Sequence, residues 1–228
     1  MVIVMSEMDQ VAELRELGSC VISDALDAIG FEGATGVIRP MVPSSPSLAG
    51  KVVTVLVEVR RADDSVGPHL ATAAIDSAKP GEVIVIANAG RTRMSSWGGM
   101  LTEAAMGRGV AGVVIDGACR DVEEAEAKGF PVFARGATPV SAKGRTREVA
   151  TNVPITIDRV RVHPGDFVVA DGNGVAFVPA DRIGAVLEAA RRILTAEHAA
   201  LEAMGQGSGA MTAIDDRAFL EGAGDGEP

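Results

Sequence analysis

Residues 95–124, SSWGGMLTEAAMGRGVAGVVIDGACRDVEE, decide the fold that this sequence predicts. After a Gly-Gly turn, the segment from Met100 to Met106 has the spacing of an amphipathic helix. The short apolar run Gly112–Ile115 indicates a buried strand, and a further helix is predicted from Val122 to Lys128. Helix, strand and helix in this order are typical of a fold that layers helices on a sheet.

The same mixture of helices and strands is predicted on both sides of this stretch. Further helices are expected at 8–17, from a Ser19 or Ser23 cap to Ala28, at 69–78 and at 179–203. Further strands are expected at 51–59, 82–87, 130–134, 153–157, 160–162, 167–170 and 175–178. Hairpin and crossover signals both occur, so we predict an α/β fold whose sheet contains parallel and antiparallel pairs.

Length and composition predict one main domain. The chain has 228 residues, of which 47% are hydrophobic, and this suffices for one well-buried core. We assign residues 1–205 to this domain. Residues 206–228 are rich in glycine and acidic residues and have little to bury, so we predict a flexible acidic C-terminal tail.

Charge and composition exclude several classes of partner. The net charge of −10 repels nucleic-acid phosphate, and an aromatic content of 3% without tyrosine offers no platform for stacking bases. No apolar run reaches the roughly 18 residues that a membrane helix needs. Met1–Met5 is too short for a signal peptide, and Cys20 and Cys119 make neither a disulfide framework nor a metal spacing. We therefore expect a cytoplasmic protein without nucleic-acid or membrane partners.

The Gly-Gly turn has two interpretations. In the first, the backbone N–H groups of Gly99, Met100 and Leu101 at the helix start bind a carboxylate or phosphate. In the second, the glycines serve only a tight turn, a neighbouring serine caps the helix, and Trp97 anchors the core or an interface.

The dipeptide Arg120-Asp121, which twenty residues separate from Gly99, also has two interpretations. Arg120 could hold a substrate oxyanion beside a metal-facing carboxylate of Asp121. Alternatively, Asp121 is the N-cap of the following helix, and Glu124 completes a capping box. Asp116-Gly117 before it reads as a strand-ending turn, and Cys119 is either activated by Arg120 or simply a small buried residue.

The run from Trp97 to Pro139, WGGMLTEAAMGRGVAGVVIDGACRDVEEAEAKGFPVFARGATP, resembles the central motif of the RraA-like family. This family includes the class II 4-hydroxy-4-methyl-2-oxoglutarate/4-carboxy-4-hydroxy-2-oxoadipate aldolases and the regulator of ribonuclease E activity A. Further matching segments are Ser23–Leu26, Gly50–Val55, Pro80–Val83 and Gly165–Pro179, so the resemblance covers about residues 10–205.

The resemblance implies an αββα sandwich with mixed sheets, similar to the swivelling phosphohistidine domain, in a homotrimer or hexamer with sites between subunits. It implies that Asp121 holds Mg²⁺ or Mn²⁺, largely through water, and that Arg120 contacts the pyruvoyl oxygen. It also implies that the backbone amides of Gly98–Leu101 (Gly98, Gly99, Met100 and Leu101) bind the pyruvate carboxylate. Glu197, on the C-terminal helix of a neighbouring subunit, matches a further substrate-binding residue.

One position departs from the aldolase pattern. The aldolases carry an acidic residue at the position of Gly99, whereas the ribonuclease regulators carry Gly there and a Glu at the position of Glu124. We expect a metal-dependent lyase that cleaves 4-hydroxy-4-methyl-2-oxoglutarate-type 2-keto acids to pyruvate and decarboxylates oxaloacetate through a shared enolate. The alternatives are a non-catalytic ribonuclease E regulator that acts by protein–protein binding, and a related lyase for another keto acid. If catalysis holds, Gly99→Asp should raise the rate by supplying a second carboxylate.

Overall fold

The computed structural model describes residues 5–44, 46–64 and 67–214. The helices are α1 (Glu7–Ala28), α2 (Thr72–Ser77), α3 (Gly99–Gly107), α4 (Val122–Ala127), α5 (Ile183–Gly205) and α6 (Ala210–Ala213). The strands are β1 (Ala34–Thr35), β2 (Arg39–Pro40), β3 (Leu48–Val59), β4 (Val83–Ser95), β5 (Gly112–Cys119), β6 (Val132–Ala137), β7 (Thr146–Thr151), β8 (Ile155–Ile157), β9 (Val160–Val162), β10 (Phe167–Asp171) and β11 (Gly174–Val178).

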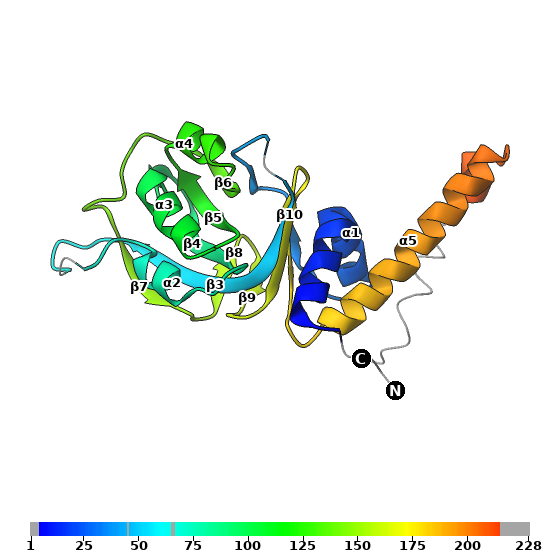
Figure 1. The fold of residues 1–228 in the computed structure, drawn as a ribbon, viewed down its shortest axis with the longest axis horizontal. Coiled ribbons are helices and arrows are strands. Elements are labelled where there is room, and N and C mark those ends of the chain that lie inside the picture. The colour runs from blue at the N-terminus through cyan, green and yellow to red at the C-terminus, as the bar shows by residue number, and fades with distance from the viewer. Residues whose placement is uncertain (1–4, 45, 65–66, 215–228) are drawn as a thin grey trace.

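The long strand β3 joins two halves of the main sheet (Figure 1). Its first residues, 48–51, pair antiparallel with β10, and the sheet continues on that side through β11 to β1. Residues 52–56 pair parallel with β4, and the parallel order continues through β5 to β6. The predicted mixture of parallel and antiparallel pairs is confirmed.

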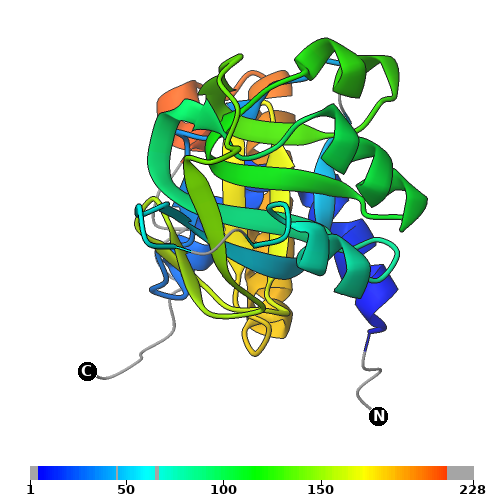
Figure 2. The ribbon, with the colours of Figure 1, turned by 90° about the vertical axis from the view of Figure 1, so that its left-hand side faces the viewer.

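The alternation of side chains along the strands shows how the two halves pack. Along Val83–Ile86 of β4, the two valines belong to a central cluster, and the two isoleucines face a second cluster under α2, α3 and α4. Along Phe167–Ala170 of β10, the second and fourth residues join the central cluster, and the first and third pack under α1 and α5. Both faces of each half are therefore buried, and the layers run helices, sheet, sheet, helices (Figures 1 and 2). The αββα sandwich is confirmed.

The predicted break in the N-terminal helix is a kink in α1. Gly18 lies there with a positive φ of 77°, a conformation that glycine adopts without strain. The second half of the helix begins at Ser19, whose N–H and hydroxyl each donate to the Asp171 carboxylate at 2.7 Å. Burial alone would raise the pKa of Asp171, but these donors and the Asn173 N–H lower it.

Three predictions about elements near the site need correction. The helix expected over 69–78 begins only at Thr72, because Ala71 is left-handed (φ 62°) and its N–H donates to Glu148. Asp116-Gly117 does not end its strand, since β5 continues to Cys119. Strand β7, which pairs with the second half of β3, was not predicted from the sequence.

The C-terminal part of the described chain ends in a turn and the four-residue helix α6. Residues 215–228 of the predicted tail lie outside the described residues, so its flexibility stays a prediction. Within the described ranges, every helix is too short or too polar to cross a membrane.

Candidate functional site

The loop before α3 is fixed to the end of β5 by its backbone. Ser96 N–H donates to the carbonyl of Ala118, and Arg120 N–H donates to the carbonyl of Trp97 at 3.0 Å. The buried Trp97 ring stacks in parallel with Phe130, and its Nε1 donates to Thr102 in the first turn of α3. Trp97 is thus the core anchor of this loop, and the start of α3 is held beside Arg120.

Gly98 is the N-cap of α3, so the N-cap residue itself makes no side-chain hydrogen bond to the helix. The suggestion that a neighbouring serine serves as the cap is therefore wrong. A Cβ on Gly98 would lie 2.7 Å from Asp121 Oδ2 and 3.0 Å from Arg120 Nε. Gly98 is required here because the side chains of Asp121 and Arg120 pack directly against its backbone.

Asp121 does not act through a capping box. It precedes α4 in a left-handed conformation (φ 58°, ψ 40°), and its side chain makes no cap hydrogen bond. Its Oδ2 instead accepts the N–H of Gly99 at 2.9 Å and lies 3.3 Å from Arg120 Nε. The positive backbone φ of a non-glycine residue is unusual, and here it turns the carboxylate away from its own helix toward the start of α3.

The Glu124 side chain also points to the start of α3. A Cβ built on Gly99 would overlap Glu124 Oε2, so the Glu124 carboxylate occupies the space that a side chain at position 99 would fill. The carboxylates of Asp121 and Glu124 therefore both lie next to Gly99 of α3, although these two residues lie at the start of α4. The sequence analysis treated Glu124 only as a capping residue or a mark of the regulator-type motif.

The N–H groups at the start of α3 are only partly available to a ligand. Gly99 donates to Asp121, and Leu101 donates to the carbonyl of Gly98. Within the described part of the chain, the N–H of Met100 has no hydrogen-bond partner. The predicted cradle of three amides thus offers Met100 as its free donor, at the positive end of the helix dipole.

A small hollow of about 20 Å³ lies at this point. Its lining includes Trp97, Gly98, Met100 and Arg120, with His69 and Leu70 facing them. Arg120 is about one-third exposed, so its guanidinium reaches solvent from beside the hollow. The volume corresponds to roughly one water molecule.

Cys119 is a buried structural residue. Burial raises the pKa of its thiol to about 11, and the nearby Asp121 carboxylate raises it as well. The thiol is therefore protonated at neutral pH, and the alternative in which Arg120 activates Cys119 is excluded.

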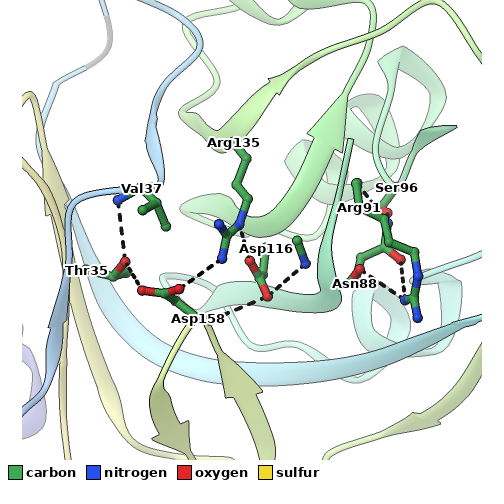
Figure 3. Close-up of polar contacts among 9 residues, drawn as sticks. Thr35, Val37, Asn88, Arg91, Ser96, Asp116, Arg135 and Asp158 are labelled. Carbon is green, nitrogen blue, oxygen red and sulfur yellow. Dashed lines mark hydrogen bonds and ion pairs between the residues drawn. The ribbon is translucent and has the colours of Figure 1, made fainter. Parts of the chain in front are cut away.

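Asp116 also belongs to the framework, as Figure 3 shows. Its buried carboxylate is paired with Arg135 and accepts the N–H of Gly90 at 3.2 Å. Arg135 also contacts Asp158, which accepts the hydroxyl of Thr35 at 3.0 Å. Burial alone would lower the pKa of Arg135, but its two carboxylate partners raise it. This network ties the irregular end of β4 to β5, β6 and the β8–β9 turn.

Glu197 lies apart from the other predicted site residues. It is on α5, and its negative charge contributes to raising the pKa of Asp24 on α1. Burial is the main cause that raises the pKa of Asp24, and Asp27 and Glu197 add to it. In Figure 1, α1 and α5 lie across the sheets from α3 and α4, so Glu197 does not meet Arg120 within one chain.

Known proteins resemble this chain over most of its length. Protein DlpA of Legionella pneumophila is 33% identical over 207 residues, which are 91% of this chain, but the chain spans only 33% of that protein's length. A protein of Halalkalibacterium halodurans, provisionally named a 4-hydroxy-4-methyl-2-oxoglutarate aldolase, is 35% identical over 82% of this chain and 84% of its own length.

A solved structure shares the fold over nearly the whole chain. The crystal structure of an uncharacterised protein from Pseudomonas syringae pv. tomato superposes with a TM-score of 0.79 at 32% identity, covering 90% of this chain and 96% of that one. The family model described as Aldolase/RraA matches residues 19–177, which include α3, Arg120, Asp121 and Glu124. This chain therefore belongs to the RraA-like family.

Proposed function

We propose that this protein is a metal-dependent pyruvate aldolase, a lyase that cleaves 4-hydroxy-4-methyl-2-oxoglutarate-type 2-keto acids to pyruvate. The same site would decarboxylate oxaloacetate. The observation that carries the proposal is the convergence of Arg120, Asp121 and Glu124 on the glycine pair at the start of α3. The provisional name of the Halalkalibacterium relative supports the aldolase class.

The chain's own groups can position a 2-keto acid. The N–H of Met100 and the positive end of α3 attract the carboxylate of the pyruvoyl unit. Arg120 presents its Nε side to Asp121, which leaves the terminal guanidinium nitrogens for the neighbouring keto oxygen. The partial exposure of Arg120 allows a substrate to reach it from solvent.

Both reactions need the same stabilisation. In aldol cleavage, the C3–C4 bond breaks, its electron pair moves toward C2, and the keto oxygen takes the negative charge of pyruvate enolate. The C4 hydroxyl gives its proton to water and becomes the second carbonyl, and the enolate then takes a proton from water at C3 to give pyruvate. In oxaloacetate, the broken bond releases CO₂ and leaves the same enolate. Arg120 faces the oxygen where the charge develops, and removing such a group typically costs roughly 10²–10³-fold in rate.

The two carboxylates fit a hard divalent cation. Mg²⁺ keeps several waters and is often bound through one or two carboxylates, and Asp121 and Glu124 supply this number beside Gly99. No group of three or more His, Cys, Asp or Glu side chains that could hold a metal occurs among the described residues. A Mg²⁺ or Mn²⁺ ion held there supplies positive charge that stabilises negative charge on substrate oxygens.

We also propose that the complete site forms in a homotrimer or hexamer. Glu197 belongs to α5, which lies across the sheets from α3 and α4, so within one chain it cannot serve a substrate at Arg120. A neighbouring copy could bring its C-terminal helix to this site. Light scattering tests the assembly, and a monomer at micromolar concentration would contradict it.

The test of catalysis is a coupled assay for pyruvate. Purified protein is mixed with oxaloacetate or 4-hydroxy-4-methyl-2-oxoglutarate and Mg²⁺, and pyruvate is followed with a dehydrogenase. We expect a rate above the metal-only control that falls roughly 10²–10³-fold in Arg120→Ala. Arg108→Ala, which removes an exposed arginine at the far end of α3, is the matched control and should keep full activity. A folded protein without a rate above the control would contradict the proposal and favour a role in binding another protein.

A further inference from the structure

His69 lies at the boundary between the hollow at Arg120 and a larger cavity. The larger cavity has a volume of about 410 Å³ and shares His69, Leu70 and Ala142 with the hollow. A 2-keto acid whose keto oxygen lies at Arg120 therefore has space for its C4 substituents on the side of His69. Since C4 is two carbons beyond the keto carbon, the bond that breaks in aldol cleavage falls close to this boundary.

The backbone around His69 is held in place by hydrogen bonds and by packing. The carbonyl of His69 accepts the N–H of Thr72 at 3.3 Å and the Thr72 hydroxyl at 2.8 Å. Leu70 is buried in the core cluster under α2, α3 and α4, and the N–H of Ala71 donates to Glu148 at 2.7 Å. These contacts fix the backbone that carries the exposed imidazole ring.

The ring can make one hydrogen bond to its own chain, and this bond selects one neutral tautomer. Nδ1 of His69 lies 3.3 Å from the carbonyl oxygen of Leu70. A carbonyl oxygen only accepts, so the contact is a hydrogen bond when Nδ1 carries the proton. In the neutral ring Nε2 is then the unprotonated nitrogen, and it can accept a proton from a substrate.

His69 is also the residue of the hollow best suited to accept a proton. The other described residues that line the hollow are apolar residues, a glycine, three serines and Arg120. Serine hydroxyls are poor bases at neutral pH, and the arginine stays protonated. Asp121 and Glu124 lie at the start of α4, where the proposed function assigns them to the cation. Histidine is the side chain that most often serves as a general base in enzymes.

We infer that His69 is the general base that takes the proton of the C4 hydroxyl in aldol cleavage. The inference rests on the proposed function, because Arg120 must hold the keto oxygen. Nε2 takes the proton, the O–H electron pair forms the new carbonyl, and the C3–C4 electron pair forms the enolate at Arg120. The exposed imidazolium then gives the proton to water, so His69 carries it from the substrate to solvent.

Aldol cleavage and oxaloacetate decarboxylation respond differently to the loss of this base. Oxaloacetate has no C4 hydroxyl proton to remove, whereas both reactions form the enolate at Arg120. His69→Gln should therefore lower the ratio of kcat for 4-hydroxy-4-methyl-2-oxoglutarate to kcat for oxaloacetate by roughly 10²-fold or more, the size of effect that a general base has. Arg120→Ala should lower both rates and leave their ratio near the wild-type value.

Chemical rescue and a matched control separate catalysis from a structural role. His69→Ala leaves space for free imidazole, which should restore part of the aldol cleavage by this variant and should not stimulate its decarboxylation. His163→Gln removes another exposed histidine, in the turn between β9 and β10, and should keep the wild-type ratio.

The contrary outcomes are distinct. A ratio that His69→Gln leaves unchanged, with or without an equal fall in both rates, would overturn the inference while the proposed function stands. If the wild-type protein formed pyruvate from neither substrate above the metal-only control, the proposed function would fail together with the inference.

Discussion

Exchanging the carboxylate between positions 99 and 124 tests the geometry of the candidate metal site. The sequence alone predicts that Gly99→Asp adds a useful second carboxylate. The structure changes this expectation, because Glu124 Oε2 already occupies the position of the new Cβ. The introduced aspartate and Glu124 would compete for one space, so we expect no increase in rate from Gly99→Asp alone.

The magnitudes follow from charge and ligand number. Two carboxylates about 4 Å apart repel each other by ~1 kcal/mol in water and by ~4 kcal/mol at an effective dielectric constant near 20. Since Glu124 ends a flexible, exposed side chain, it should move away and give its place to the introduced aspartate. Glu124→Ala removes one of the two carboxylates beside Gly99. We expect this change to weaken Mn²⁺ binding roughly 10- to 100-fold, because the loss of a side chain that orients the ligands of a metal usually has an effect of this size.

Titration of Mn²⁺, followed by electron paramagnetic resonance, measures the metal directly. We expect wild-type affinity to fall in Glu124→Ala and to recover to within about tenfold in the double variant Gly99→Asp/Glu124→Ala. Glu123→Ala, which removes the neighbouring exposed carboxylate, is the matched control. Unchanged binding in Glu124→Ala, or no recovery in the folded double variant, would refute this description of the metal site.

Two further predictions concern the framework. Asp171→Asn replaces one of the two carboxylate oxygens that accept from Ser19 with an amide donor and removes the negative charge, so we expect a loss of about 1 kcal/mol at pH 7. Because the folded-state pKa of Asp171 is lowered, its contribution is present above the unfolded value near ~3.9 and is lost as the pH falls through the folded value. The difference between the urea midpoints of variant and wild type should therefore be largest at pH 7 and narrow progressively as the pH falls below ~3.9. Iodoacetamide at pH 8 should modify the exposed Cys20 and spare Cys119, whose pKa is raised to about 11, and labelling of Cys119 in the native protein, detected by mass spectrometry, would contradict its assignment.

Local patterns in the sequence predicted most of the fold. The alternating residues of β3 and the apolar runs of β4 and β5 identify strands, because their side chains must enter cores on two faces. By contrast, β7 was missed, since TREVAT has a weak apolar pattern, and its pairing with β3 spans a long separation in the chain. Strand pairing of this kind depends on tertiary contacts more than on intrinsic propensity.

The candidate site was predictable where its parts share one helix–strand–helix unit. The Gly98 turn, Arg120 and Asp121 meet because β5 returns the chain to the start of α3. The orientation of Asp121 was not predictable, because its sequence fits a capping box, and only the contact with the Gly99 N–H shows that the carboxylate turns the other way. The position of the Glu124 carboxylate follows from the way the chain turns at Asp121. The combination of Gly99 with Glu124 was a signal in the sequence that these two residues could lie together.

The most direct measurement is a crystal structure with pyruvate and Mg²⁺. Our account predicts the keto oxygen within hydrogen-bond distance of the Arg120 guanidinium and the carboxylate near the Met100 N–H. It also predicts the cation beside Asp121 and Glu124. Pyruvate bound elsewhere, or Arg120 directed away from an empty hollow under saturating conditions, would contradict it.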